Sequence, residues 1–234
     1  MLLGVLIAAA FLAQRVKSSN SPSADAIAEL TKPAKKIPFK EVVLATTQNH
    51  ILDFDTNNTA HIALRKKILQ AAVLAGERAR TNGLAAARAN EAGNHIEPLV
   101  RAALHEVGLQ ARIPVTPAGE AQATGYPDIE IVGDVPCYLE LKTYSAATAN
   151  TTQRSFYYSP SAHPKVTRDA LHLLLAYELE KVERTGKIIF LPVHWKLISL
   201  QDLQVDLKFE FNQSNRGLYG KDAAGSVLGE SETK

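Results

Sequence analysis

The fold is decided by the stretch Gly125-Tyr-Pro-Asp-Ile-Glu-Ile-Val-Gly-Asp-Val-Pro-Cys-Tyr-Leu-Glu-Leu-Lys-Thr-Tyr144. Two short apolar runs flank Gly133-Asp134, a pattern that predicts two strands joined by a tight turn. Side chains alternate across a strand, so Glu140 and Lys142 share one face of the second strand. The stretch therefore predicts a hairpin that carries charged side chains on one face.

The length of the turn decides which side chains meet. A three-residue loop, 133–135, places Asp128 opposite Glu140, with their Cβ atoms about 5 Å apart. Two carboxylates that close repel each other unless a cation lies between them, and Mg²⁺ takes one or two carboxylates plus waters. A two-residue turn would instead pair Asp128 with Leu139 and place the carboxylates on opposite faces. A metal site on this hairpin requires the longer loop.

These residues carry a resemblance to a known family. The motif is Pro127-Asp128, followed after an eleven-residue gap by Glu140-Leu141-Lys142. It resembles the PD-(D/E)xK signature of the restriction-endonuclease-like nuclease superfamily. Within that superfamily, the chain is most similar to a type II restriction endonuclease. The resemblance implies an α/β fold with an αβββαβ core, over roughly residues 94–200, preceded by an N-terminal helical region. The alternative is an exposed hairpin with a surface Glu–Lys pair, worth a few tenths of a kcal/mol.

The resemblance also implies a site and a substrate. Asp128, Glu140 and the Leu141 carbonyl would hold Mg²⁺, with Mn²⁺ as a substitute, and Lys142 would orient the attacking water. Glu97 matches an acidic position near the metal. The alternative for Glu97 is a favourable place at a helix N-terminus. The substrate would be double-stranded DNA, hydrolysed by an endonuclease that needs no small-molecule cofactor.

Four further residues are candidates for nucleic-acid binding. Gln153 and Arg154 follow the motif strand and would touch phosphate or a base edge, or else belong to a solvated loop. Lys165 and Arg168 begin the next expected helix, where cations oppose the helix dipole unless an anion binds there.

The surrounding pattern predicts the order of the elements. In the core we expect a helix beginning near Glu97 and ending at Gly108, a strand at 109–116, the hairpin, a buried helix at 165–184 and a central strand at 187–200. Outside it we expect a helix at 24–30, a strand at 42–44, basic helices at 61–90 with a break at Gly83, and a strand at 205–211. The basic residues of 61–90 read either as a solvated face or as phosphate contacts.

The expected domain organisation follows that order. Residues 1–40 would form an apolar N-terminal segment and linker, 41–93 a helical region, 94–212 the nuclease core and 213–234 a flexible tail. Apolar residues make up 46% and charged residues 21% of the chain, which are globular values. With 26 basic and 24 acidic residues, DNA binding must come from local basic clusters. The single Cys137 excludes an internal disulfide.

The apolar run Leu2–Ala13 is too short to cross a bilayer, at about 1.5 Å per helical residue. It has the length of a signal peptide but no preceding Lys or Arg, and a docking helix or an extension upstream of the natural start are the other interpretations. We expect a cytoplasmic protein and a homodimer that cuts both DNA strands, with membrane association left open. The alternatives are an exported nuclease or toxin, and a non-catalytic nucleic-acid-binding module on the same fold.

Overall fold

The structure is a computed structural model that describes residues 22–86, 89–152, 154–184 and 186–212. The chain divides into two compact units, Lys36–Val205 and the two terminal segments Met1–Lys35 and Asp206–Lys234. In the terminal unit, helix α2 (Ala24–Leu30) is capped by the Ser23 hydroxyl, which confirms the helix predicted there. None of the described helices is long and apolar enough to span a membrane, and the run Leu2–Ala13 lies outside the described residues.

A seven-stranded mixed sheet organises the larger unit, with the strand order β3-β8-β7-β6-β5-β4 and β2 paired to β7. Strands β5 and β6 are antiparallel, β6 and β7 parallel, and β7 and β8 antiparallel. Strands β1 and β9 form a separate two-stranded sheet. The strands are β1 Ala34–Pro38, β2 Ile51–Leu52, β3 Leu84–Ala85, β4 Gln110–Arg112, β5 Ile129–Val132, β6 Cys137–Tyr144, β7 Ala170–Arg184, β8 Lys187–Ser199 and β9 Gln204–Leu207.

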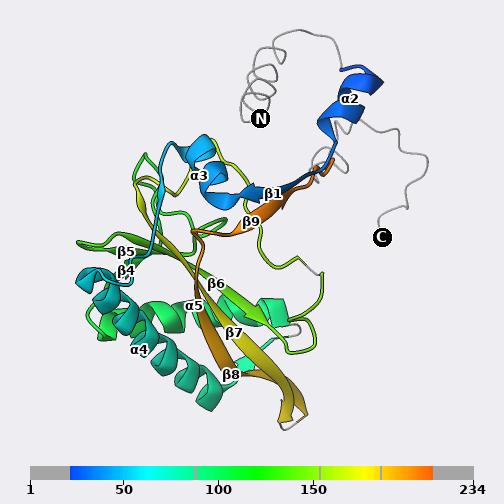
Figure 1. Ribbon diagram of the computed structural model, residues 1–234. Helices are drawn as coiled ribbons and strands as arrows, with labels where there is room; N and C mark the ends of the chain where they lie inside the picture. The colour runs from blue at the N-terminus through cyan, green and yellow to red at the C-terminus, as the bar shows by residue number, and fades with distance from the viewer. Residues whose placement is uncertain (1–21, 87–88, 153, 185, 213–234) are drawn as a thin grey trace, which may run out of the picture. The chain divides into compact units, whose positions relative to one another are not determined.

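One face of the large sheet is covered by two helices, α4 (Thr59–Asn82) and α5 (Ala89–Glu106), which lie against each other and against the strands (Figure 1). The Tyr177 hydroxyl of β7 donates a 2.8 Å hydrogen bond to the Ala72 carbonyl of α4. Helix α4 begins at an Asn58 cap and is followed by Gly83 at φ 69°, a conformation that favours glycine. The helical N-terminal region and its break at Gly83 are confirmed.

The opposite face carries a second, aromatic cluster. Helix α3 (Phe39–Thr47) brings Phe39 against Tyr126, Phe156 and Tyr158, with ring centroids 5.1–5.4 Å apart and nearly perpendicular planes. Edge-to-face contacts of this kind add to the energy of apolar burial. The cluster fixes the long connection between β6 and β7 on the sheet.

The predicted α/β class is confirmed, and its mixed sheet with helices is compatible with a restriction-endonuclease-like core. Three element predictions were wrong. The expected helix at 165–184 is instead strand β7, and the expected strand at 42–44 is part of α3. Strand β8 exists as predicted, but it lies near the sheet edge beside the short β3 and is largely exposed, rather than central.

Candidate active site

The β5–β6 hairpin brings the two motif carboxylates together. Its ladder pairs Ile129 with Leu139 and Ile131 with Cys137, so one step further the same register places Asp128 opposite Glu140. This is the register that the longer turn predicted, and the alternative with Asp128 opposite Leu139 was wrong. Asp128 Oδ2 accepts a 2.7 Å hydrogen bond from the Leu141 N–H, which fixes the Asp128 carboxylate against β6.

Glu140 is buried, with 3% of its surface exposed. Lys142 Nζ donates to Glu140 Oε1, while Oε2 is buried and has no hydrogen-bond partner among the described residues. Burial, followed by the Asp128 carboxylate, raises the pKa of Glu140 to about 7 against the opposing effect of Lys142. Burial also raises the pKa of Asp128, against the Leu141 N–H. The pair therefore favours a proton or a cation close to its oxygens.

A second lysine reaches the pair from a distant segment. Lys165 is 3% exposed, and its Nζ donates to the Gly125 carbonyl. Burial lowers the pKa of Lys165, and the charges of Asp128, then Glu140 and Glu97, raise it in turn. The structure thus brings Lys165 to the carboxylates, where the sequence predicted only a contact with nucleic acid.

A cleft of about 480 Å³ opens beside Asp128. Its walls come from α5, from the end of β6 and from the connection that follows β6. The lining residues are Gly93, Asn94, Glu97, Asp128, Leu141, Lys142, Thr143, Tyr144, Ser145, Thr148, Arg154, Ser155 and Tyr157. The cleft therefore joins the predicted catalytic residues Asp128, Lys142 and Glu97 with the predicted DNA contact Arg154.

Glu97 lines the cleft but not at the start of a helix. Helix α5 begins at Ala89 and contains Pro98 in its interior, so the predicted helix start near Glu97 was wrong. The Glu97 carboxylate lies 2.8 Å from the guanidinium group of Arg101, one helical turn away. An interior position removes the helix-dipole explanation for Glu97, because that effect is confined to the first turn.

The other predicted DNA contacts lie in different places. The Arg154 guanidinium stands over the Tyr157 ring at 5.5 Å. Arg168 lies 3.3 Å from Glu130. Gln153 is outside the described residues.

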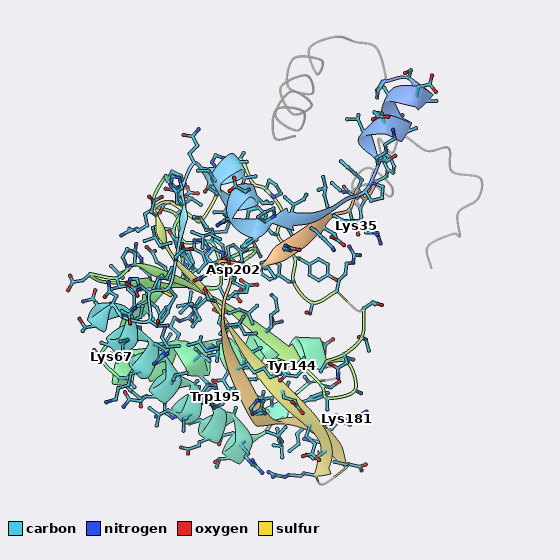
Figure 2. All side chains as sticks on the ribbon, viewed as in Figure 1. Lys35, Lys67, Tyr144, Lys181, Trp195 and Asp202 are labelled. Atoms are coloured by element: carbon cyan, nitrogen blue, oxygen red, sulfur yellow. The ribbon has the colours of Figure 1, made fainter. Side chains whose placement is uncertain are left out.

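The basic side chains of α4 do not reach the cleft, since no described residue of that helix lines it. Lys67 donates to the Gly108 carbonyl, and Arg78 forms two 2.6 Å hydrogen bonds with Glu106 of α5. Figure 2 shows Lys67 well apart from Tyr144, which marks the cleft. The reading of these residues as a solvated face therefore agrees with their positions.

The carboxylate pair fits a hard divalent ion. Within the described ranges, no group of three His, Cys, Asp or Glu side chains lies close enough to hold a metal. Mg²⁺ does not need three, because it binds one or two carboxylates and keeps several waters. The buried Glu140 Oε2 without a hydrogen-bond partner is an atom that an ion beside Asp128 would satisfy.

The motif does not include Glu130, although the sequence places this acidic residue next to it. Glu130 follows Asp128 by two residues and therefore lies on the same face of β5. It is 2% exposed and contacts Arg112 and Arg168. The alternation alone could have indicated a third acidic group beside the motif.

With this geometry in place, comparison with known proteins defines the class. The chain belongs to a family of type II restriction enzymes, because the Type II restriction enzyme MjaV family matches residues 32–222. A relative is the Type II restriction enzyme MjaV of Methanocaldococcus jannaschii, which is 33% identical over 212 residues, or 83% of this chain and 90% of the relative. The predicted resemblance to a type II restriction endonuclease is confirmed.

Proposed function

We propose that this protein is a Mg²⁺-dependent endonuclease that hydrolyses phosphodiester bonds of double-stranded DNA, with a site of the PD-(D/E)xK kind. The observation that carries the proposal is the buried Glu140 beside the half-buried Asp128 and next to Lys142, with Glu140 Oε2 lacking a hydrogen-bond partner among the described residues. Membership of a restriction enzyme family supports DNA as the substrate.

Asp128, Glu140 and the Leu141 carbonyl would hold Mg²⁺, or Mn²⁺ in its place. Bound there, the ion would supply a water of lowered pKa and neutralise charge that develops on the phosphate. The Leu141 N–H already holds one Asp128 oxygen, so the carboxylate is oriented before any ligand arrives. Such preorganisation lowers the cost of binding.

Lys142 would act on the water and on the phosphate. An ammonium group has three donors, and one of them reaches Glu140. The others would orient the attacking water and stabilise the negative charge on the phosphorus oxygens. Hydrolysis then forms a bond from the water oxygen to phosphorus and breaks the bond from phosphorus to the leaving sugar oxygen, which takes up a proton.

Residues around this centre would hold the DNA. Arg154 lines the cleft, and it would contact a phosphate. Lys165 lies close to both carboxylates and would offset their charge as a phosphate approaches. Glu97, at the cleft wall, would orient a metal-bound or attacking water.

The proposal is tested by incubating the protein with plasmid and genomic DNA, with Mg²⁺ and with a chelator instead. We expect cleavage only with the ion. Asp128→Ala should abolish cleavage and preserve or tighten DNA binding, because it removes a negative charge near phosphate. Lys142→Ala should lower the cleavage rate by about 10²–10³-fold and leave metal binding intact.

Asp134→Ala is the matched control, because it removes an exposed carboxylate from the turn of the same hairpin and should cut at the wild-type rate. An Asp128→Ala protein that still cuts DNA in Mg²⁺ would refute the mechanism. Binding without cleavage in any divalent ion would identify a non-catalytic DNA-binding module instead.

A further inference from the structure

Glu130 joins two arginines that come from distant parts of the chain. Arg112 Nε donates a 2.8 Å hydrogen bond to Glu130 Oε2, and Arg168 places a terminal nitrogen 3.3 Å from Oε1. Each carboxylate oxygen therefore faces one guanidinium group, by a hydrogen bond at Oε2 and by charge alone at Oε1, which has no hydrogen-bond partner among the described residues. The side chain of Glu130 is 3% exposed, whereas those of Arg112 and Arg168 are 46% and 44% exposed.

Stability alone does not account for this arrangement. Burying an ion pair is costly, and replacing one by apolar residues of similar volume is often neutral or stabilising. Glu130 pairs across the β5–β6 ladder with Tyr138, which is on the same face and fully buried, so an apolar residue would suit this position. What Glu130 does provide is a fixed position for two half-exposed guanidinium groups.

Both arginines are held by the backbone as well. Arg112 pairs directly with Glu130 in the β4–β5 ladder. The segment before Arg168 is fixed by Tyr138, whose hydroxyl accepts a 3.0 Å hydrogen bond from the Thr167 N–H. Two ordered cations, each with N–H donors beyond the one that faces Glu130, thus stand beside β5, the strand that follows Asp128.

We propose that Arg112 and Arg168, positioned by Glu130, form a second phosphate-binding site that holds the DNA backbone beside the point of cleavage. The inference rests on the proposed function. Asp128 and Glu130 are two residues apart on one face of the chain, a separation of about 7 Å along a strand. The three side chains carry a net positive charge, and a planar guanidinium binds phosphate through paired hydrogen bonds.

The test measures binding of a duplex of arbitrary sequence, without metal, across a range of salt concentrations. Each phosphate contact adds about one to the slope of log K against log salt concentration. Arg112→Gln and Arg168→Gln should therefore each reduce the slope by about one. Arg112→Lys and Arg168→Lys keep the charge and should retain the slope.

Arg78→Gln is the matched control. Arg78 is 38% exposed and pairs with Glu106, but it lies on the helices that cover the other face of the sheet. Its slope should equal that of the wild type. A slope that stays unchanged in the Arg112 and Arg168 variants, or a wild-type protein that binds no duplex, overturns the proposal. So does an affinity loss confined to particular sequences at an unchanged slope, which indicates base contacts.

Binding without metal is read separately from cleavage, so failure of the catalytic proposal and failure of this one are distinguishable. Thermal unfolding shows whether each variant folds. Should a glutamine variant unfold, the double variant that also carries Glu130→Gln, and so leaves no buried charge unpaired, is compared with Glu130→Gln alone. A slope smaller than that of Glu130→Gln supports the phosphate contact, and an equal slope overturns it.

Discussion

At the scale of the residue, the site is built on an unfavourable contact. Glu140 is buried beside Asp128, and only one of its oxygens is engaged, by Lys142. A buried carboxylate next to a second one prefers a proton to a negative charge. The protein without metal therefore carries a local instability that a cation would relieve, and this has a measurable pH dependence.

Glu140→Gln should reveal that instability. The folded protein raises the pKa of Glu140 from 4.5 to about 7, so stability from this group is fully present below pH 4.5 and is lost as the pH rises through about 7. In a chelator, the wild type should lose up to about 3 kcal/mol of unfolding free energy between pH 4 and pH 8.5 relative to Glu140→Gln. Urea unfolding at both pH values measures it.

Added Mg²⁺ should restore part of the wild-type stability at pH 8.5 and none in Glu140→Gln, since ligands that bind the folded state stabilise it. A difference between the two proteins that is the same at pH 4 and pH 8.5 would contradict the assignment of the shift to Glu140.

Local alternation was sufficient to predict which motif residues share a strand face, because Glu140 and Lys142 are two residues apart. Their pairing with Asp128 depended on the length of one turn, which left two registers open until the structure showed the longer loop. Lys165 could not be placed this way, because its contact with Gly125 spans 40 residues and depends on how the β6–β7 connection folds. The same holds for Arg112 and Arg168, which meet only through Glu130.

At the scale of the element, the largest error was the prediction of a helix at 165–184, where the structure has strand β7. Its Leu, Ala and Glu residues favour helix, and its first six residues include only one that is not buried. Alternation is absent because both faces of β7 are covered, one by α4 and α5 and the other by the aromatic cluster. A run that is apolar on every side fits a buried helix and a central strand equally well. Pairing with β6 and β8 decides the outcome.

Leu175→Ala should test how much of the fold depends on this strand. Leu175 is completely buried in the cluster formed with α4 and α5, so the change should lower the unfolding free energy by about 2–5 kcal/mol. Ile188→Ala is the control from the turn end of the β7–β8 hairpin, where Ile188 pairs with Glu183. Figure 2 labels Lys181 of β7 in this hairpin. Ile188 is 42% exposed, and its change should cost less than about 1 kcal/mol. Equal costs in urea unfolding would contradict this division of the hairpin.

At the scale of the whole molecule, the two sheet faces have different tasks. Helices α4 and α5 bury one face, and the aromatic cluster lies on the other. Glu140 alternates with the buried Leu139 and Leu141 and so points away from the first cluster, while the cleft beside Asp128 has residues of α5 in its wall. Helix α4 packs on α5 and β8, and these three elements all lie in the unit Lys36–Val205. The division of the chain at residues 40, 93 and 212 stays a prediction, because sequence patterns near a boundary do not record which distant elements share a core.

The protein should act on DNA as a homodimer. Each chain has one pair of Asp128 and Glu140 in its described part, and one such site, if it acts as proposed, would hydrolyse one strand at a time. Cutting both strands of a symmetric site calls for two copies related by a two-fold axis. We therefore expect a homodimer on DNA in light scattering, and direct conversion of supercoiled plasmid to linear product with little nicked circle.

Mixing subunits separates this from a single chain that acts twice. With a tenfold excess of Asp128→Ala protein, most active chains would be paired with an inactive one, so nicked circles should accumulate at the expense of linear product. The same excess of Asp134→Ala protein, which keeps Asp128 and Glu140, should still give linear DNA. A single chain that cuts twice predicts nicked circles already with the wild type, and an excess of Asp128→Ala would then slow both products without changing their ratio.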